Sequence, residues 1–325
     1  MNAITKLDLL HLEALVDRYD VGELIRYWPA ANGIENSNYF LATQKEGVER
    51  QYVLTVLEQP SNAGESLVPL LDSCVEAGLP VPVVLRDMDG GAYNQLNGKP
   101  MLLCQRLPGQ HAYNPTTRQV EALGRFTARF HTATAGLAFP LPPYPRDAEW
   151  LDVKARACVG RVGWAAGDLM MDTARRIARG LGRQDVKSLP QGPIHGDLFR
   201  DNVLFSAQGL TGVLDFHHAA TGYLIYDLAV AANDWCTDAQ GAIDPERALA
   251  LLRSYHAIRP LQKQELWHFP LFCLYAALAF WLSRTTGALK GRGQSIARSK
   301  NPHEFQRIVA HHTAHFFYVD ERQLG

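Results

Sequence analysis

Residues 195–205, which read HGDLFRDNVLF, contain side chains whose types and spacing fit phosphoryl transfer. An Asp held in a tight loop can accept the proton of an attacking hydroxyl, and Mg²⁺ prefers carboxylate and amide oxygens as ligands. His195, Asp197 and Asn202 have the spacing H-x-D-x₄-N that is typical of a phosphoryl-transfer catalytic loop. We therefore predict that Asp197 is the catalytic base and that Asn202 and Asp215 are the metal ligands.

A β-hairpin between Asn202 and Asp215 would explain how these two residues meet. Residues 203–214 (VLFSAQGLTGVL) are predicted to form two short strands around a turn that ends at Gly209. Such a hairpin places Asn202 and Asp215 at the same end, so that their oxygens converge on one cation. We expect His195 to be a packed, hydrogen-bonded scaffold residue and not a proton shuttle.

The elements that must position these residues fall into two lobes. Residues 1–106 are predicted to form a nucleotide-binding lobe built on a small antiparallel sheet, with one hairpin closed by Lys45-Glu46-Gly47. The expected strands are residues 24–28, 39–43, 51–57, 81–85 and 100–107, and helices are expected near the N-terminus and at residues 64–76.

Residues 107–325 are predicted to form a larger, mainly helical lobe for catalysis and substrate binding. We expect Asn114-Pro115 to cap its first helix and the proline-rich residues 140–145 to form a rigid connector. The expected helices are residues 115–131, 224–235, 245–256, 262–284 and 304–315. The predicted fold class is therefore α+β, with two lobes.

Composition excludes several other classes of protein. The chain has 32 Lys and Arg against 33 Asp and Glu, a net charge of −1, so no broad attraction for nucleic acid or an anionic membrane is expected. The most apolar run, residues 271–282, is too short to span a bilayer, which takes about 20 residues. Five scattered cysteines fit a reducing compartment. We expect a cytoplasmic protein, and composition leaves its oligomeric state open.

Several motifs resemble a known family. HGDLFRDNVLF, followed by GVLDFHHA at residues 212–219, is similar to the aminoglycoside phosphotransferase and choline kinase superfamily, whose fold is protein-kinase-like. NSNYF, GLPVP, YDLA, NDWC and FWLSR, in that order along the chain, resemble the homoserine kinase branch of that superfamily. The resemblance covers nearly the whole chain. It implies ATP- and Mg²⁺-dependent phosphorylation of the homoserine side-chain hydroxyl, on the route to threonine.

The resemblance also implies where the nucleotide binds. Residues 33–38 would cover the phosphates with backbone N–H groups, and the lobe connection at residues 104–107 would offer its backbone to the adenine. The third strand of kinases usually carries a Lys that binds phosphates, but here Thr55 stands in its place. Neither Lys45 nor Lys99 is a convincing replacement. The predicted nucleotide-binding residues are Asn36, Ser37, Asn38, Thr55, Gln105 and Leu107.

A zwitterionic acceptor such as homoserine needs both a cationic and an anionic partner. Arg200 could bind its carboxylate or a phosphate, Arg284 could bind the carboxylate, and Asp234 could bind the ammonium group. His217 could line the pocket or be a structural residue. Alternatively, Arg200 forms a salt bridge with a neighbouring acid, and Arg284 complements the C-terminus of its helix. We expect Asp227 to hydrogen-bond the catalytic loop from within the core. His311, His312 and His315 are expected to lie on the surface.

Two alternative functions remain open from the sequence. The first is a sister kinase that phosphorylates an aminoglycoside, choline, methylthioribose or an amino sugar. The second is a nucleotide-binding pseudokinase, which the missing third-strand Lys would suggest. The joint presence of Asp197, Asn202 and Asp215 argues against the second, because a protein that only binds nucleotide has little need of a catalytic base.

Overall fold

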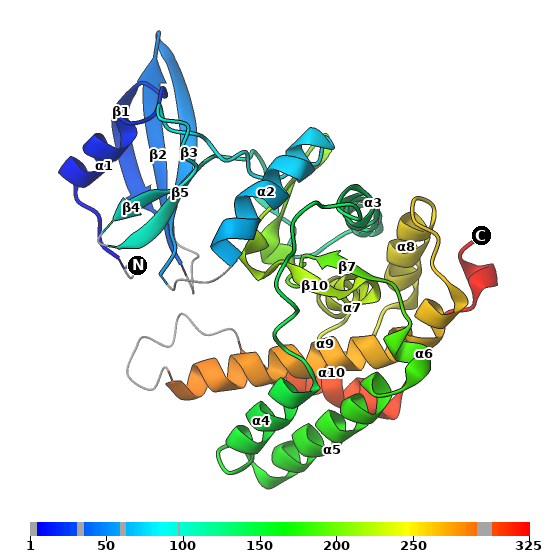
Figure 1. Ribbon diagram of the computed structural model, residues 1–325. Helices are drawn as coiled ribbons and strands as arrows, with labels where there is room; N and C mark the ends of the chain where they lie inside the picture. Colours follow the sequence, from blue (N-terminus) through cyan, green and yellow to red (C-terminus); the bar gives the residue numbers. More distant parts are fainter. Residues whose placement is uncertain (1–4, 31–35, 59–62, 97, 291–300) are drawn as a thin grey trace. The chain divides into compact units, whose positions relative to one another are not determined.

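The computed structural model describes residues 5–30, 36–58, 63–96, 98–290 and 301–325. The chain forms two compact units, one of residues 1–109 with 212–214 and the other of residues 110–211 with 215–325. The first unit contains an antiparallel sheet and the second is mainly helical (Figure 1). The α+β class expected from the sequence is confirmed.

The sheet of the first unit has the strand order β1-β2-β3-β5-β4. The turn between β2 and β3 has two residues, Glu46 and Gly47, both with positive φ (52° and 78°), which matches the right-handed twist of the strands. The predicted hairpin at this turn is confirmed. The strands are β1 (Glu23–Pro29), β2 (Ser37–Lys45), β3 (Val48–Val56), β4 (Asn94–Leu96) and β5 (Lys99–Gln105).

One face of this sheet packs against helix α1 (Leu9–Val16), as Figure 1 shows. Leu12 of α1 shares a buried apolar cluster with alternate residues of the strands, such as Leu41 and Leu54. Because side chains alternate between the two faces of a strand, Asn38, Phe40 and Thr55 belong to the opposite face. The two faces therefore differ in kind: one is apolar core and the other carries polar side chains near the start of β2.

The expected strand at residues 81–85 is wrong. Only Val84 forms a bridge, with Cys104, although the N–H of Leu85 also donates to the carbonyl of Leu103. Pro80 and Pro82 lack the N–H groups that a regular ladder needs, which explains the irregular pairing. Strand β4 was not expected. Helix α2 (Ala63–Glu76) forms as expected, with Pro69 inside it.

The helices of the second unit agree closely with the pattern of apolar residues. The first, α3, begins after Thr116, whose side chain and that of Gln119 form a capping box, so the expected cap at Asn114-Pro115 is wrong. The helices are α3 (Thr117–Ala133), α4 (Ala148–Val159), α5 (Trp164–Leu181), α6 (Gln184–Lys187), α7 (Leu224–Trp235), α8 (Pro245–His256), α9 (Lys263–Lys290) and α10 (Pro302–Ala314).

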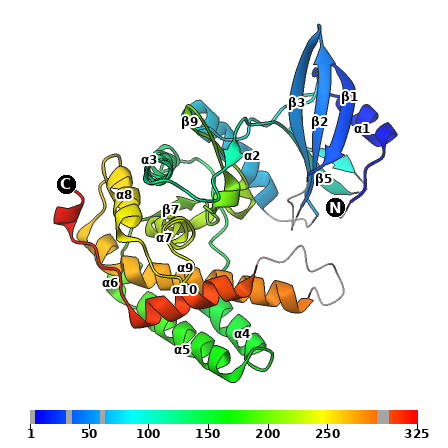
Figure 2. The same ribbon diagram turned by 180° about the vertical axis from the view of Figure 1, so that it is seen from behind.

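Helix α9 is the centre of the second unit. It contacts α4, α5, α7 and α10, and Figure 2 shows α10 running alongside it. Residues 263–289 are long and apolar enough to cross a membrane, but 83% of the most apolar window is buried inside the protein. Its apolar side chains therefore form the core around which the other helices pack.

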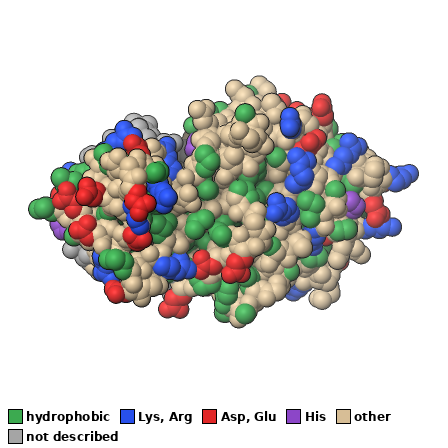
Figure 3. Space-filling model, turned by 90° about the horizontal axis from the view of Figure 1, so that it is seen from above, with side chains coloured by type: hydrophobic (Ala, Val, Ile, Leu, Met, Phe, Trp, Pro, Cys, Tyr) green, Lys and Arg blue, Asp and Glu red, His purple; other side chains and the backbone are tan. Residues whose placement is uncertain are grey.

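Short strands frame the region of the sequence motif. β7 (Gln191–Ile194) pairs with β10 (Ala220–Tyr223), and β6 (Gln110–His111), β8 (Val203–Ser206) and β9 (Gly209–Val213) form a three-stranded sheet in the order β6-β8-β9. The motif therefore lies on loops between short strands, as expected. Figure 3 shows acidic and basic side chains interspersed on the face it displays, in line with the near-zero net charge.

Candidate active site

The loop of residues 195–202, which we call the catalytic loop, is held at its start by helix α7. Asp227 of α7 is buried, and its carboxylate accepts the backbone N–H groups of His195 and Gly196, both at 2.8 Å. Gly196 has a φ of 75°, a conformation that glycine adopts without strain. The expectation that Asp227 hydrogen-bonds the loop from within the core is confirmed.

The buried Asp227 has a further partner in helix α3. The Nε2 atom of His131 lies 3.0 Å from the Asp227 carboxylate, and its Nδ1 atom lies 2.7 Å from the hydroxyl of Tyr255. All three side chains are buried. A buried carboxylate is tolerated only when its oxygens are hydrogen-bonded, and here two backbone groups and one imidazole meet that need.

His195 is part of the framework of the loop. Its side chain is fully buried, and its Nδ1 atom accepts the backbone N–H of Asp197 at 3.2 Å. Its ring packs edge-on against Phe216, with the ring centres 4.6 Å apart. The imidazole thus ties Asp197 to the segment that carries Asp215, which confirms the scaffold role expected for His195.

Helix α7 also holds the far end of the catalytic loop. Asp234 lies seven residues after Asp227, two helical turns along the same face. Its carboxylate accepts the backbone N–H of Arg200 at 2.7 Å and the guanidinium Nε of the same residue at 3.1 Å. The indole N–H of Trp235 donates to the carbonyl of Leu198 at 2.9 Å. Two aspartates of one helix therefore hold the two ends of the loop.

This contact alters the interpretation of two predicted substrate residues. Burial raises the pKa of the Asp234 carboxyl, and the positive charge of Arg200 opposes that rise. Arg200 also donates to the carbonyl of Tyr113 at 2.8 Å. Of the two readings of Arg200, the structure places it in a salt bridge with a neighbouring acid. Asp234 and Arg200 therefore position the loop, and their predicted contacts with a substrate receive no support from this geometry.

Asn202 is positioned by the other end of the same loop. It closes a 3₁₀ turn of residues Arg200–Asn202, and its Nδ2 atom donates both to the carbonyl and to the carboxylate of Asp197, at 2.8 Å each. The amide nitrogen is thus used to orient Asp197. The amide oxygen is the atom that remains for a cation, as predicted for a metal ligand.

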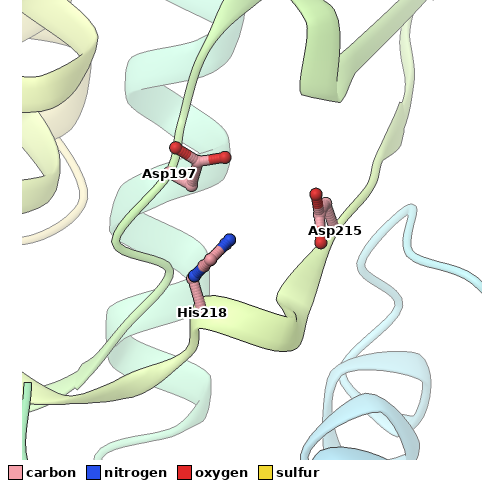
Figure 4. A group of neighbouring side chains, drawn as sticks. All are labelled: Asp197, Asp215 and His218. Atoms are coloured by element: carbon pink, nitrogen blue, oxygen red, sulfur yellow. The ribbon is translucent and has the colours of Figure 1, made fainter. Parts of the chain in front are cut away.

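Asp215 lies close to Asp197, together with a residue that the sequence reasoning missed. One ligand atom each of Asp197, Asp215 and His218 lies within 4.8 Å of the other two, and Figure 4 shows the three side chains directed toward a common space. Asp197 and His218 are partly buried, and Asp215 is exposed. The structure therefore brings together the predicted base and the predicted metal ligand that follows the second strand of the hairpin.

The backbone at Asp215 explains why His218 belongs to this group. Asp215 has φ 62° and ψ 55°, the left-handed conformation, and it begins a 3₁₀ turn over Phe216–His218. A 3₁₀ helix has three residues per turn, so residues at i and i+3 lie on the same side. His217, the predicted pocket residue, is one position out of this phase. If a 3₁₀ turn had been predicted from the sequence, it would have identified His218, and not His217, as the residue near Asp215.

The donor set fits a hard divalent cation. Asp215 can supply a carboxylate oxygen and Asn202 an amide oxygen, which are the ligand types of Mg²⁺ or Ca²⁺. The carboxylate of Asp197, the predicted base, lies beside that of Asp215. A Zn²⁺ site would more typically contain several imidazoles or thiolates. All five cysteines are free thiols, and none is among the three residues of this group.

Arg284 does not end its helix. Helix α9 continues to Lys290, so the expectation that Arg284 complements a helix C-terminus is wrong. Its guanidinium forms an ion pair with Glu304 of α10 at 2.5 Å and lies over the ring of Phe305, 4.4 Å from the ring centre. The side chain is 9% exposed. Arg284 therefore joins α9 to α10.

In the first unit, Asn38 and Thr55 form a cross-strand pair. The Thr55 hydroxyl donates to the Asn38 side-chain oxygen at 2.7 Å, on the face of the sheet opposite α1. Asn36 accepts the backbone N–H of Glu58 at 3.3 Å, and the Ser37 hydroxyl accepts the N–H of Thr5 at 2.9 Å. Three of the predicted phosphate-binding residues, at positions 33–35, lie outside the described residues.

Neither lysine considered as a substitute for the third-strand Lys is placed to act as one. Lys99 forms an ion pair with Glu58 at 2.5 Å and donates to the Thr5 hydroxyl at 2.8 Å. By strand alternation this pair belongs to the α1 face of the sheet, opposite to Thr55. Lys45 forms an ion pair with Asp20.

The predicted adenine-binding segment lies beside a surface pocket. Gln105 ends β5, where its N–H donates to the carbonyl of Val83 at 3.0 Å. Gln105 and Leu107 line a pocket of about 610 Å³ together with Arg50 and Tyr52. The segment is extended, as a backbone that presents N–H and C=O groups to a base must be.

The expectation of a surface position is wrong for His312. Its side chain is buried and its Nε2 atom lies 2.8 Å from the side-chain oxygen of Asn233 in α7. Burial, together with the charge of His311, lowers the pKa of His312 to about 4. His315 is exposed, as expected. His312 is therefore a neutral core residue that supports α7 from behind.

Comparison with known proteins now extends this picture. The profile described as "Phosphotransferase enzyme family" matches residues 27–261. A homoserine kinase of Pseudomonas aeruginosa (strain UCBPP-PA14) is 37% identical over 311 residues, which cover 95% of this chain and 96% of the relative.

Solved structures support the same fold. A microcompartment-associated aminopropanol kinase superposes with a TM-score of 0.70 at 18% identity, covering 94% of this chain and 96% of its own. An amicoumacin kinase, solved in complex with AMP-PNP, Ca²⁺ and Ami, superposes with a TM-score of 0.69 at 14% identity, covering 94% of this chain and 92% of its own. At these identities the likeness establishes the fold alone.

Proposed function

This chain belongs to the phosphotransferase enzyme family, in the branch of the homoserine kinases, and we propose that it transfers the γ-phosphate of ATP to the side-chain hydroxyl of homoserine. The product, O-phosphohomoserine, lies on the route to threonine. The observation that carries the proposal is the placement of Asp197, whose carboxylate is oriented by Asn202 and lies beside Asp215.

Asp197 is proposed to act on the acceptor hydroxyl. Its carboxylate accepts the hydroxyl proton while the oxygen forms a bond to the γ-phosphorus, and the bond from that phosphorus to the β–γ bridging oxygen breaks to release ADP. Asn202 keeps the carboxylate aimed by donating to it, and the N–H bond to His195 fixes the backbone of the base. The geometry thus holds the base before the acceptor arrives, which reduces the entropy lost on reaching the transition state.

The proposed metal ligands are Asn202 and Asp215, and the proposed cation is Mg²⁺. When bound, the cation would neutralise negative charge on the phosphates. His218 lies beside both carboxylates and is proposed to hydrogen-bond one of them, which would orient it toward the cation.

We further propose that residues 1–106 bind the nucleotide and that residues 107–325 carry the base, the metal ligands and the acceptor site. Backbone N–H groups near Asn36, Ser37 and Asn38 would bind phosphates, and the backbone of Gln105 and Leu107 would contact adenine. Thr55, which the sequence puts where other kinases carry a phosphate-binding Lys, donates its hydroxyl to the side-chain oxygen of Asn38. The protein is proposed to act on this small molecule in the cytoplasm.

The proposal is tested by product formation with a panel of acceptors. Purified protein is incubated with ATP and Mg²⁺ and with L-homoserine, choline, an aminoglycoside, methylthioribose or 3-amino-1-propanol, and ADP and phosphomonoester are measured. We expect homoserine to give the highest kcat/KM, and chelation of the metal to abolish turnover. Phosphorylation of another acceptor with none of homoserine would overturn the substrate assignment, and ATP binding without turnover of any acceptor would favour a pseudokinase.

A further inference from the structure

Glu304, in the first turn of helix α10, lies between two arginines that come from different parts of the fold. One of its carboxylate oxygens is 2.5 Å from Nη1 of Arg284 in α9, and the other is 3.7 Å from Nη2 of Arg200 in the catalytic loop. One carboxylate therefore contacts both the central helix of the second unit and the loop that carries the proposed base. The reaction proposed above gives Glu304 no role.

The two arginines depend on Glu304 to different degrees. Arg284 is 9% exposed, and in the described part of the chain Glu304 is the one carboxylate in ion-pair contact with it. Arg200 has a second carboxylate, that of Asp234, and a hydrogen bond to the carbonyl of Tyr113. Burial opposes the charge of Arg200, but Asp234 and then Glu304 outweigh burial and raise the pKa of its guanidinium. Loss of the Glu304 charge would thus leave Arg284 without an anionic partner and Arg200 with one of two.

The contact between α10 and the catalytic loop has two adjacent members. Next to the contact of Glu304 with Arg200, the ring of Phe305 lies against that of Phe199, with the ring centres 5.9 Å apart. Both rings are buried. Consecutive residues of α10 therefore meet consecutive residues of the loop, so that a displacement of the first turn of α10 would be transmitted to residues 199–200.

The position of Arg200 in the loop gives this contact its significance. Arg200 follows the proposed base Asp197 by three residues and begins the 3₁₀ turn that ends at Asn202, the proposed metal ligand. Its backbone N–H donates to Asp234 of α7, and its side chain is held by Asp234 together with Glu304 of α10. The segment between the proposed base and the proposed metal ligand is therefore fixed from two helices and not from α7 alone.

We infer that Glu304 is a positioning residue for phosphoryl transfer, which acts through Arg200 to hold the segment between Asp197 and Asn202 in its productive conformation. The inference rests on the proposed function and deepens it by adding a residue from outside the catalytic loop and α7. The two contacts of Glu304 then have separable effects. Its ion pair with Arg284 stabilises the packing of α10 on α9, and its contact with Arg200 aligns the loop.

The test begins with Glu304→Gln, which keeps the length of the side chain and removes its charge. We expect kcat to fall about tenfold, with KM for ATP and for the acceptor within about twofold of the wild type, because a misaligned base slows the chemical step and leaves binding intact. The midpoint of thermal unfolding should fall by about 3 °C, because the buried charge of Arg284 loses its partner.

Glu121→Gln is the matched control. The Glu121 side chain is 42% exposed, against 40% for Glu304, and it pairs with Arg125 of the same helix, α3, at 3.6 Å. This variant should keep kcat within about twofold and the unfolding midpoint within about 1 °C of the wild type, because an exposed ion pair contributes little to stability.

Two double-mutant cycles separate alignment from stability. In the background of Arg284→Met, Glu304→Gln should no longer lower the unfolding midpoint, but it should still lower kcat about tenfold. In the background of Arg200→Met, whose kcat is already reduced, Glu304→Gln should change kcat by less than about twofold, because the residue through which it acts is gone.

A loss of kcat that disappears in the Arg284→Met background would show that Glu304 acts only on stability, and would overturn the inference. A tenfold loss that persists in the Arg200→Met background, or an unchanged kcat in Glu304→Gln, would overturn it as well. All variants are measured with the acceptor that the wild type phosphorylates best. A wild type that does not phosphorylate homoserine would instead overturn the proposed substrate, which keeps the two failures distinct.

Discussion

Two segments carry the candidate active site, and they are held in opposite ways. The catalytic loop of residues 195–202 is held by long-range contacts with buried side chains of α7, namely those of Asp227, Asp234 and Trp235. The turn of residues 215–218 begins at an exposed Asp215, whose left-handed backbone sets the direction of the turn.

The difference separates two tasks. A proton acceptor must be aligned within a fraction of an ångström. Asp197, the proposed acceptor, is fixed through hydrogen-bonded neighbours. A cation ligand must instead remain accessible to ions and solvent, and Asp215, the proposed ligand, is exposed. Its backbone conformation is uncommon for a residue with a side chain, and such conformations are found often at functional sites. Substitutions in the two segments should therefore differ in whether they lower activity alone or lower activity and stability together.

Asp197→Asn should have the largest effect on activity. The Asn side chain can keep its contact with Asn202 but cannot accept the hydroxyl proton, so kcat should fall by about 10²–10⁴-fold. Nucleotide affinity and the midpoint of thermal unfolding should stay close to those of the wild type. Turnover within tenfold of the wild type would remove Asp197 from the role of base.

Asp215→Gly should separate activity from stability. Glycine adopts a φ of 62° without strain, so the unfolding free energy should be unchanged or slightly raised. Removal of the carboxylate should lower kcat by about 10²-fold or more and weaken divalent-cation binding. Calorimetric titration with Mg²⁺ in the presence of a nucleotide analogue measures the second effect. Cation affinity equal to that of the wild type would show that Asp215 is not a ligand.

Asp227→Asn should lower both activity and stability. An amide offers one oxygen to the two backbone N–H groups and turns a donor toward the other, so the unfolding free energy should fall by about 2–3 kcal/mol. Denaturant unfolding and kcat are measured on the same samples. Asp172→Asn, on an exposed side chain of α5, is the control and should change stability by less than about 0.5 kcal/mol. A stable Asp227→Asn variant would contradict the clamping role of α7.

His312→Gln should have the smallest effect on stability at neutral pH and a measurable effect on stability at acid pH. The pKa of His312 is about 4 in the folded protein, below the value of about 6.5 expected for the unfolded chain, so the unfolded state binds the proton more tightly. Stability should therefore fall as the pH drops from about 6.5 to about 4, by about 3 kcal/mol in total.

Gln can still donate to Asn233 but does not titrate, so the His312→Gln variant should lose this part of the pH dependence. His303→Gln, at an exposed position of α10, should keep it. Because Asn233 belongs to α7, acid should weaken the support of the catalytic loop before it affects the turn at Asp215. Identical pH profiles for His312→Gln and the wild type would exclude His312 as the responsible group.

Much of the fold could be predicted because local patterns decide it. The bounds expected for α7 and α8 agree with the structure, since periodic apolar residues and the Asp244-Pro245 start mark them. The hairpin at Glu46-Gly47 was likewise predictable from its turn residues. Residues 81–85 were misassigned because Pro80 and Pro82 lack N–H groups, so the segment pairs with β5 only irregularly.

Within the site, the family comparison confirms the predicted phosphotransferase class. The spacing of Asp197 and Asn202 anticipated their contact, which spans five residues. His218 was missed because its membership depends on a 3₁₀ turn after a left-handed residue. Arg284 was wrongly expected to lie at a helix end because the sequence pattern did not show that α9 continues to Lys290.

The order of residues by itself indicated the phosphotransferase class. It also placed the proposed proton acceptor, the proposed cation ligands and the turn between them within residues 195–215. Only the tertiary structure decided which charged groups are already paired with one another, as Asp234 is with Arg200 and Arg284 with Glu304. The physical reason is that the ion-pair partner of a charged side chain can come from a distant part of the chain. The spacing of residues along the sequence does not identify that partner.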